Sequence, residues 1–477
     1  MRSARIRYIA VGVVIGLVAI TSACSRKDDG NTTDAQAGTN TTVGSSGAPG
    51  NGQFGSLTNP VCGPAPTTGS AAPSGATQTG LTADTISLGT ISDVGYSGAP
   101  GLNQELYDAS DVFASWCNSL GGLNGHQIKI HKLDAKITEY KQRIQEACET
   151  DFALVGGGGV FDDAGQTDRL SCLLPDFPGY VVSNGARGAG LQVQATPGSN
   201  SNVQAGMFRY LAATFPDSMA NTGFLTGNIA TTINNKAQYQ EAAQSFGFQT
   251  VYDERYNPVG EPTWTPFAQA IKDKGVKGLY FVGEPGNLSK LLDALSQIDY
   301  KLDWVGAAGN QYDQALIDGA GSALDTNTVF VQVGVTPFLA TDIPAIPQYE
   351  QLFKQYLPNG KSQASLGLNA FSAWLLFAQS VKSCGADITR RCVYDAGIKV
   401  TSWSGGGLSA QASPASQQPG DCFAMVKTDG AKFVLNNWET TKDGIWNCDP
   451  ANVVPTTGDF GQPPTLASVG KTIDDVP

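Results

Sequence analysis

Histidine and the motifs of common hydrolases are scarce in this chain. Its 477 residues include two histidines, His126 and His131. This scarcity disfavours a zinc site or a Ser-His-Asp triad, because both depend on histidine. Neither a Gly-x-Ser-x-Gly elbow nor a His-Glu-x-x-His motif occurs. The sequence is still compatible with one class of enzyme, a glycosidase that acts through carboxylates alone. We predict a protein that is not an enzyme and that uses no metal ion and no cofactor.

Charge is also sparse, and positive charge is rarer than negative charge. Charged residues make up 15% of the chain, and the formal net charge is -12. An acidic protein is repelled by the phosphates of nucleic acids and by anionic lipid headgroups. We therefore expect no nucleic acid partner.

Residues 1–23 have the organisation of a secretory signal peptide. Three arginines precede an uncharged apolar run, Tyr8 to Ile20, which is short for a membrane span. Cys24 follows small residues and resembles the cysteine of a bacterial lipobox, although Thr21 stands where leucine is usual. This pattern implies cleavage before Cys24, a lipid on that cysteine, and a place on the extracytoplasmic face of a bacterial cell membrane. The alternative is a soluble secreted protein.

The other eight cysteines contain no Cys-x-x-Cys pair, which disfavours redox and zinc motifs. An even number in an exported protein indicates up to four disulfides. Local spacing favours two of them, and adjacent predicted helices suggest a third, although the sequence leaves the connectivity open. The expected pairs are Cys384–Cys392, Cys422–Cys448, Cys148–Cys172 and, by remainder, Cys62–Cys117.

Residues 24–83 are dominated by small and polar residues, with almost no bulky apolar side chain before Phe54. Such a segment cannot bury enough apolar surface to fold. We predict a disordered tether between the lipid and the folded part of the chain. Cys62 is the exception and could fasten the end of the tether to the first lobe.

Four consecutive glycines, Gly156 to Gly159, end a short apolar run, Phe152 to Val155, and precede a predicted helix. This order is typical of a parallel strand that leads through a loop into a crossover helix. In open α/β sheets, ligands bind at such loops. We interpret the glycines as a candidate ligand-binding loop, and the alternative is a tight turn without a ligand.

Strand and helix patterns alternate along most of the chain, which predicts an α/β fold with two parallel sheets. The first cycle ends with a predicted strand at Gly179–Ser183, and the second begins with a predicted helix at Asn202–Phe215. The predicted organisation is a signal peptide (1–23), a tether (24–83), lobe 1 (84–198), lobe 2 (199–334), a return to lobe 1 (335–412), a hinge with a C-terminal hairpin (413–447) and a loose tail (448–477).

Five stretches in a fixed order carry a resemblance to a known family. They are Ile86–Ile91, Gly121–Gly125, Ala153–Gly156, Gly278–Gly283 and Asn369–Ala378. Together they resemble the type I solute-binding proteins of ABC importers, in particular the leucine/isoleucine/valine-binding group. The resemblance implies two Rossmann-like lobes with parallel sheets, joined by a three-strand hinge and closing over a small molecule. It also implies ABC permease subunits as partners, and we expect a monomer.

The resemblance places ligand contacts at particular positions of this sequence. In the first lobe they are Ser92, Tyr96, Gly158, Gly159, Val160, Phe161, Gly185, Ala186 and Arg187. In the second lobe they are Asn228, Thr231, Glu284, Ala308 and Asn310.

The departures from the family pattern affect the ligand. In amino-acid-binding members, an acidic residue at the position of Ala308 pairs with the ligand's ammonium group, and this chain lacks it. Glu284 could replace that acid, and Arg187 could hold a carboxylate. The alternative for either residue is exposure at the cleft mouth or pairing within its own lobe. Asp162 and Asp163 fit the opening of a helix better than ligand binding.

These observations predict a lipid-anchored protein that captures a small polar or amphipathic solute, such as an amino acid or amide, and delivers it to an ABC importer. The alternative is a surface lipoprotein of the same fold that senses a ligand and signals to a partner. The solute class stays open between amino acids, amides, urea-like and aromatic compounds and short peptides.

Overall fold

The computed structural model describes residues 51–64, 78–441 and 444–477. The expected signal peptide (1–23) and the expected lipid site, Cys24, lie outside the described residues, as does most of the expected tether. No helix in the described ranges is long and apolar enough to cross a membrane.

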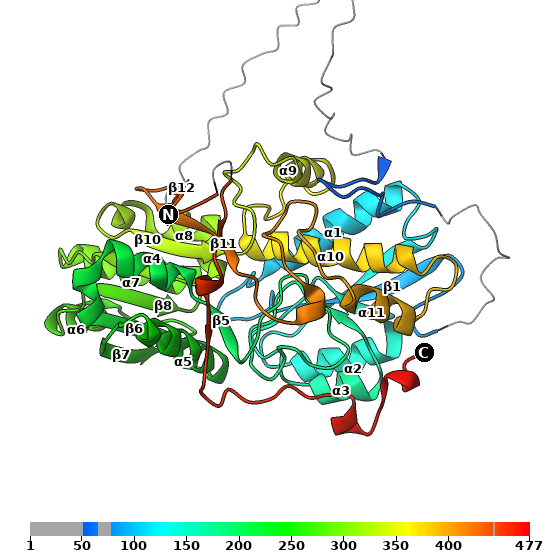
Figure 1. Cartoon of the computed structure of the whole chain (residues 1–477), viewed down its shortest axis with the longest axis horizontal. Coiled ribbons are helices and arrows are strands. Elements are labelled where there is room, and N and C mark those ends of the chain that lie inside the picture. The colour runs from blue at the N-terminus through cyan, green and yellow to red at the C-terminus, as the bar shows by residue number, and fades with distance from the viewer. Residues whose placement is uncertain (1–50, 65–77, 442–443) are drawn as a thin grey trace, which may run out of the picture. The chain divides into compact units, whose positions relative to one another are not determined.

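Lobe 1 is built on a parallel sheet that, among the described residues, has the strand order β2-β1-β3-β4 (Figure 1). Alternate residues of a strand point to opposite faces. Ile86 and Leu88 therefore pack with α1 and α10, while Ile91 packs with α2 on the other face. The strands are β1 Thr85–Ser92, β2 Gln127–Asp134, β3 Ala153–Val155 and β4 Asp176–Phe177. The helices are α1 Gln104–Ser119, α2 Tyr140–Thr150, α3 Gln166–Ser171 and, from the returning chain, α9 Ala345–Tyr356, α10 Ser365–Ser383 and α11 Arg390–Ile398.

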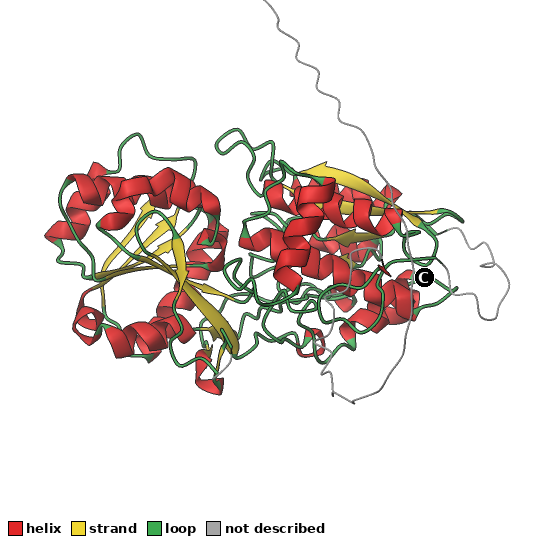
Figure 2. Ribbon diagram, turned by 90° about the horizontal axis from the view of Figure 1, so that it is seen from above, coloured by secondary structure: helices red, strands yellow, loops and turns green. Residues whose placement is uncertain are grey.

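Lobe 2 has a larger sheet whose described strands run in the order β12-β11-β10-β9-β8-β6-β7, with β13 beside β11. Strands β10 to β7 are parallel, and the β11–β12 hairpin adds antiparallel. Figure 2 shows this sheet between two layers of helices. The strands are β6 Thr222–Gly227, β7 Thr250–Tyr256, β8 Gly278–Val282, β9 Trp304–Ala307, β10 Val329–Val333, β11 Cys422–Thr428, β12 Phe433–Leu435 and β13 Asn447–Cys448. The helices are α4 Gly206–Thr214, α5 Ala230–Ser245, α6 Thr265–Asp273, α7 Pro285–Gln297 and α8 Gln314–Ala320.

The described chain crosses between the lobes near residues 196–205, 334–340 and 410–421. The second and third crossings are paired with each other, because the Ala410 amide donates to the Gly334 carbonyl at 2.8 Å and Val335 bridges Ser409. The first crossing contains β5, Asn202–Gln204, which pairs with β14, Val453–Pro455. The C-terminal tail makes a further crossing, because it leaves β13 beside β11 of lobe 2 and ends on lobe 1, where the Gly190 amide donates to the Pro464 carbonyl at 3.0 Å.

The described residues contain the four disulfides expected from the sequence, Cys62–Cys117, Cys148–Cys172, Cys384–Cys392 and Cys422–Cys448. The first of them belongs to a segment, residues 51–64, that was expected to be disordered. Phe54 is completely buried there and packs against Trp116 and Phe371. Hydrogen bonds add to this attachment, since the Ser56 amide donates to the Gly406 carbonyl and the Gly55 amide to the Gln348 side chain, each at 2.8 Å.

Three further expectations differ from the structure. Residues 179–183 form a loop, and the strand before them is β4. Residues 202–204 form β5 in place of the first turn of a helix, because their partner strand lies some 250 residues further along the chain. The C-terminal tail from residue 448 is not loose, since β14 pairs with β5 and the Arg391 guanidinium donates to the Ile473 carbonyl at 2.6 Å.

Candidate functional site

A cavity of about 650 Å³ lies between the two lobes. Its walls come from loops at the carboxyl ends of parallel strands of both lobes, which is where ligands of open α/β sheets bind. Lobe 1 contributes the loops after β1, β2, β3 and β4, and lobe 2 contributes those after β6, β7, β8, β9 and β10. The first turn of α10 adds Ser365, Leu366 and Asn369.

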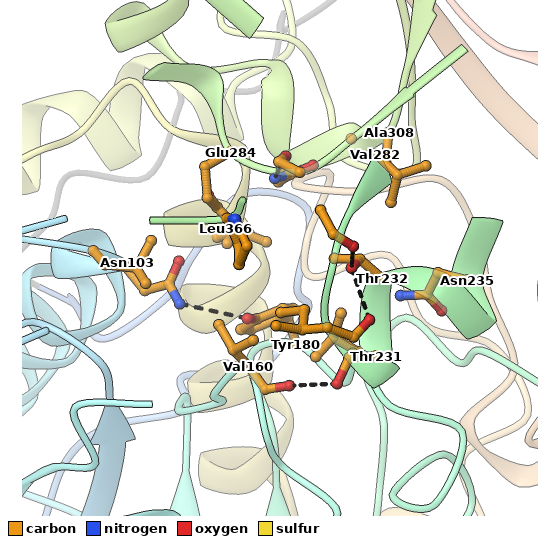
Figure 3. A pocket seen from close by; sticks show the side chains of 18 of the residues that line it. Asn103, Val160, Tyr180, Thr231, Thr232, Asn235, Val282, Glu284, Ala308 and Leu366 are labelled. Atoms are coloured by element: carbon orange, nitrogen blue, oxygen red, sulfur yellow. Dashed lines mark hydrogen bonds between the residues drawn. The ribbon is translucent and has the colours of Figure 1, made fainter. Parts of the chain in front are cut away.

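The cavity has apolar and aromatic walls with a few polar groups, as is usual for small-molecule sites. Figure 3 shows Tyr180, Val160, Val282 and Leu366 around it. The Tyr180 hydroxyl accepts a hydrogen bond from the Asn103 side-chain amide at 3.4 Å. Burial raises the pKa of Tyr180 well above its usual value, so this phenol stays protonated at physiological pH.

The two lobes contact each other across the cavity. The Thr231 hydroxyl at the start of α5 donates to the Val160 carbonyl of lobe 1 at 2.9 Å (Figure 3). Arg187 of lobe 1 donates to the side chains of Asn235 and Gln238, both on α5. The structure is therefore one in which the lobes have already approached each other around the cavity.

Arg187 is a half-buried cation whose hydrogen-bond partners are all neutral. Its guanidinium donates to the Gln238 side-chain oxygen at 2.5 Å, to the Val182 carbonyl at 3.0 Å and to the Asn235 side-chain oxygen. Among the described residues it forms no ion pair. Burial lowers its pKa, but a guanidinium stays charged at physiological pH. The cavity thus contains a positive charge with no carboxylate beside it.

Glu284 is the acidic group in the cavity lining. It is the residue before α7, and no described residue donates a hydrogen bond to its carboxylate. Burial raises its pKa to about 7, the charges of Glu105 and Asp313 act in the same direction, and Lys361 opposes them. The group is therefore balanced between its neutral and charged forms near neutral pH.

A cluster of charged side chains behind Glu284 connects the lobes. Lys361 of the returning chain contacts Glu105 of α1 at 2.9 Å and Asp313 of lobe 2 at 2.6 Å. The side chains of both acids are almost fully buried, at 4% and 6% exposure. Burial opposes charge on Lys361, but Glu105 and Asp313 outweigh it and raise its pKa above the usual value. One lysine therefore compensates acids from both lobes.

Glu284 gives the site an expected pH dependence. A ligand that places an ammonium group at Glu284 requires the deprotonated carboxylate, so its affinity should rise as pH rises through about 7. For a group titrating there, the increase between pH 6 and pH 8 is about tenfold. Calorimetric titrations at the two pH values measure it.

The matched variant is Glu284→Gln, which keeps the shape of the side chain and removes its titration. The affinity of this variant for the same ligand should change little between pH 6 and pH 8. An unchanged tenfold pH effect in this variant would assign the titration to another group.

Eight of the expected ligand residues line the cavity. They are Tyr96, Val160, Phe161, Arg187, Thr231, Glu284, Ala308 and Asn310. Of these, Val160 and Thr231 also form the contact between the lobes, and the Asn310 side-chain amide donates to the Gly283 carbonyl at 3.0 Å.

Six expected ligand residues lie behind the cavity wall or outside it. They are Ser92, Gly158, Gly159, Gly185, Ala186 and Asn228. The Ser92 hydroxyl donates to the Asn103 carbonyl at 2.9 Å, Ala186 is completely buried, and Asn228 is exposed. The predicted glycine loop has a packing role at this point: a Cβ atom on Gly158 would overlap the Tyr180 ring, and one on Gly159 would lie 2.7 Å from Tyr140. These glycines let the protein's own aromatic rings approach the loop.

Asp162 was expected to open a helix, and this expectation is wrong, because α3 begins at Gln166 after Gly165 and has no side-chain cap. Its buried carboxylate accepts hydrogen bonds from the amides of Val182 and Ser183 at 2.7 and 2.9 Å. Burial raises its pKa to about 7, and the hydrogen bonds oppose that shift. Asp162 therefore positions the loop that carries Tyr180 and Arg187.

Several lining residues were not foreseen from the sequence. They include Asn103, Tyr180, Asn235, Tyr239, Tyr256 and Asn369. Asn103 has a left-handed backbone at the residue before α1, with φ 57°, which is the one local feature that could have drawn attention to it. The others reach the cavity through tertiary packing.

Two α/β lobes around such a cavity define a solute-binding protein. The sequence model described as "Periplasmic binding protein" matches residues 85–432. The chain belongs to this family, whose members bind solutes. Its fold is the type I fold implied by the resemblance noted above, with mixed α/β lobes and parallel sheets. A comparison with curated protein sequences finds no match.

Solved structures share this fold at low sequence identity. The fatty acid ABC transporter substrate-binding protein from Thermomonospora curvata has a TM-score of 0.66 and 14% identity, covering 78% of this chain and 95% of that one. The branched-chain amino acid transporter substrate binding protein from Streptococcus pneumoniae, in complex with isoleucine, has a TM-score of 0.61 and 14% identity, covering 74% and 100%. A solute binding protein of an ABC transporter from R. palustris, in complex with 4-hydroxybenzoate, has a TM-score of 0.59 and 13% identity, covering 77% and 98%.

Proposed function

We propose that this protein is a lipid-anchored, extracytoplasmic receptor that binds a small carboxylate with an apolar body and delivers it to an ABC importer. The observation that carries the ligand class is Arg187, a cation in the cavity wall whose described partners are all neutral. A charged hydrogen bond to a carboxylate in a partly dehydrated site is stronger than one to a neutral group. The apolar walls provide the remaining affinity by excluding water.

The ligands named for the three solved structures support this class. A fatty acid, isoleucine and 4-hydroxybenzoate differ in size and shape, but each carries a carboxylate attached to an apolar body. Glu284 adds a second requirement, namely a hydrogen-bond donor on the ligand away from the carboxylate. Loss of an acid at Ala308 argues against a plain branched-chain amino acid as the favoured solute.

Ligand capture is tested by a thermal-shift screen of amino acids, aliphatic and aromatic carboxylates, and the corresponding amides. Binding to the folded state raises the melting temperature by an amount that grows with the logarithm of ligand concentration over Kd, so carboxylates should raise it and the matched amides should not. A mass spectrum of molecules that co-purify with the protein gives independent evidence. A screen in which no carboxylate raises the melting temperature would refute the proposed ligand class.

The anchor and the importer need separate measurements. In cells that produce the full chain, Cys24→Ala should move the protein from the membrane fraction to the soluble exported fraction, because the cysteine that would carry the lipid is absent. Cells that produce the wild-type protein should take up the labelled solute, and cells that lack the protein should not. If the Cys24→Ala protein stays with the membrane, the lipid is not its anchor.

A further inference from the structure

A second cavity of about 290 Å³ adjoins the first. Several residues line both, including Arg187, Thr196, Tyr239 and Asn369. The second cavity extends toward the crossings between the lobes, where Ala410, Ala412 and Gly420 line it. Arg187 therefore stands at the junction of two spaces, and a bound carboxylate there could connect groups in both.

The second cavity differs from the first in its chemistry. Carboxamide side chains surround it, from Asn202, Gln204, Gln238 and Gln332, and Arg187 is the charged residue in its described lining. Several of these amides are already fixed by the protein. Gln332 donates to Gln204, and Gln204 donates to the Gly420 and Cys422 carbonyls at 2.8 Å each. Apart from Arg187, the space is thus lined by neutral polar groups, several of which are held in place by the protein.

Two side chains at this cavity have hydrogen-bonding capacity that the protein does not use. Asn369 lies on α10, among residues that are almost all buried, and no described residue hydrogen-bonds to its carboxamide. Asn202 donates to Gln418 at 2.8 Å, while its side-chain oxygen accepts from no described residue. These groups suit a ligand portion with N–H or O–H donors and a carbonyl, as found in an amide.

We propose that the second cavity is a subsite for the same ligand, and that this ligand is a small carboxylate with an amide-linked extension. Its carboxylate would lie at Arg187, its apolar side chain in the first cavity and its amide portion in the second. A carboxylate that branches between an apolar side chain and an amide is the arrangement of an N-acylated amino acid or of the last residue of a short peptide. This inference rests on the proposed function, since it requires Arg187 to bind a carboxylate.

The test uses pairs of carboxylates that differ only by the extension. One pair is 3-(4-hydroxyphenyl)propanoate and N-acetylglycyl-tyrosine, and equivalent pairs are built on leucine and phenylalanine. Calorimetric titration of the full chain should show at least one extended member binding tenfold or more tightly than its short partner. Equal or weaker binding of the extended member in every pair would overturn the subsite.

A filling variant locates the effect. Ala412→Trp places a large side chain in the second cavity, and it should remove the tenfold preference for the extended member. Ala415→Trp is the matched control, because Ala415 is exposed and lines neither cavity; it should keep the preference. Melting temperatures of both variants establish that they fold.

The outcomes separate this inference from the proposed function. If short carboxylates bind and the extension adds nothing, the subsite is wrong and the proposed function stands. If Ala412→Trp weakens both members of a pair equally, the extension does not occupy the second cavity and the inference fails. If no carboxylate binds at all, the proposed ligand class fails and the subsite fails with it.

Discussion

Replacing Arg187 by methionine should lower the affinity for the bound carboxylate by roughly thirtyfold or more. Methionine keeps most of the length and apolar surface of the side chain and removes its charge. Truncating one partner of a desolvated, hydrogen-bonded charge pair costs about 2–5 kcal/mol, and about 1.4 kcal/mol is a factor of ten. Calorimetric titration of the tightest-binding acid from the screen, with wild type and variant, measures the loss.

Arg187 also connects the lobes, so its role in closure must be separated from its role in binding. Asn235→Ala removes one of its acceptors on α5 and leaves the guanidinium in place. We expect that variant to lose affinity by about tenfold, less than Arg187→Met, since one hydrogen bond of a charged group contributes about 1.5 kcal/mol and the guanidinium keeps its bonds to Gln238 and Val182. Equal losses in the two variants would make Arg187 a residue of lobe closure only. The amide analogue of the same acid should bind wild type and Arg187→Met alike.

Replacing Lys361 by methionine should lower the free energy of unfolding by about 3 kcal/mol. The substitution leaves Glu105 and Asp313 without their shared cation, and removing one partner of a buried ion pair costs about 3–5 kcal/mol. The lower end applies because the lysine side chain is 34% exposed, which lets water screen the charges. Urea denaturation followed by tryptophan fluorescence measures the difference.

Two comparisons test the cause of this destabilisation. Lys132→Met removes the lysine of an exposed pair with Asp111, which should change stability by less than about 1 kcal/mol. Adding Glu105→Gln and Asp313→Asn to Lys361→Met should restore part of the loss, because no carboxylate then remains unpaired. Equal stability of Lys361→Met and wild type would show that the cluster contributes nothing to the fold.

The sequence predicted the order of the elements well because that order is written in local patterns. Short apolar runs followed by glycines or turn residues identify β1, β3 and β8 without any knowledge of the contacts these strands make. The predictions of secondary structure and disorder are wrong where contacts with residues distant in the sequence determine the local structure. Residues 202–204 pair with β14, and Phe54 packs between α1 and α10. Neither contact leaves a trace in the neighbouring sequence.

The candidate site divides in the same way. Glu284 reaches the cavity because it follows closely on β8, and strand ends converge at one edge. Arg187 lies in the long loop after β4 and reaches the cavity through the fold of that loop. Gly158 does not line the cavity, and its lack of a side chain leaves room for the Tyr180 ring, a packing need that the sequence could not distinguish from a binding one. Tyr180 and Asn369 were missed because their direction depends on the Asp162 contacts of one loop and on the docking of α10. Neither the Asp162 contacts nor the docking of α10 can be predicted from the local sequence.

The attachment of residues 51–64 makes the two lobes mechanically unequal. Tension that arrives along the polypeptide before residue 51 enters α1 through the Cys62–Cys117 crosslink and the Phe54 contact, both of which belong to lobe 1. In a molecule held by its N-terminal end, lobe 1 would keep its position and lobe 2 would move relative to it. If the proposed lipid anchor holds this end, a transporter beside it would meet lobe 1 in a constant orientation and would respond to ligand binding through the displacement of lobe 2.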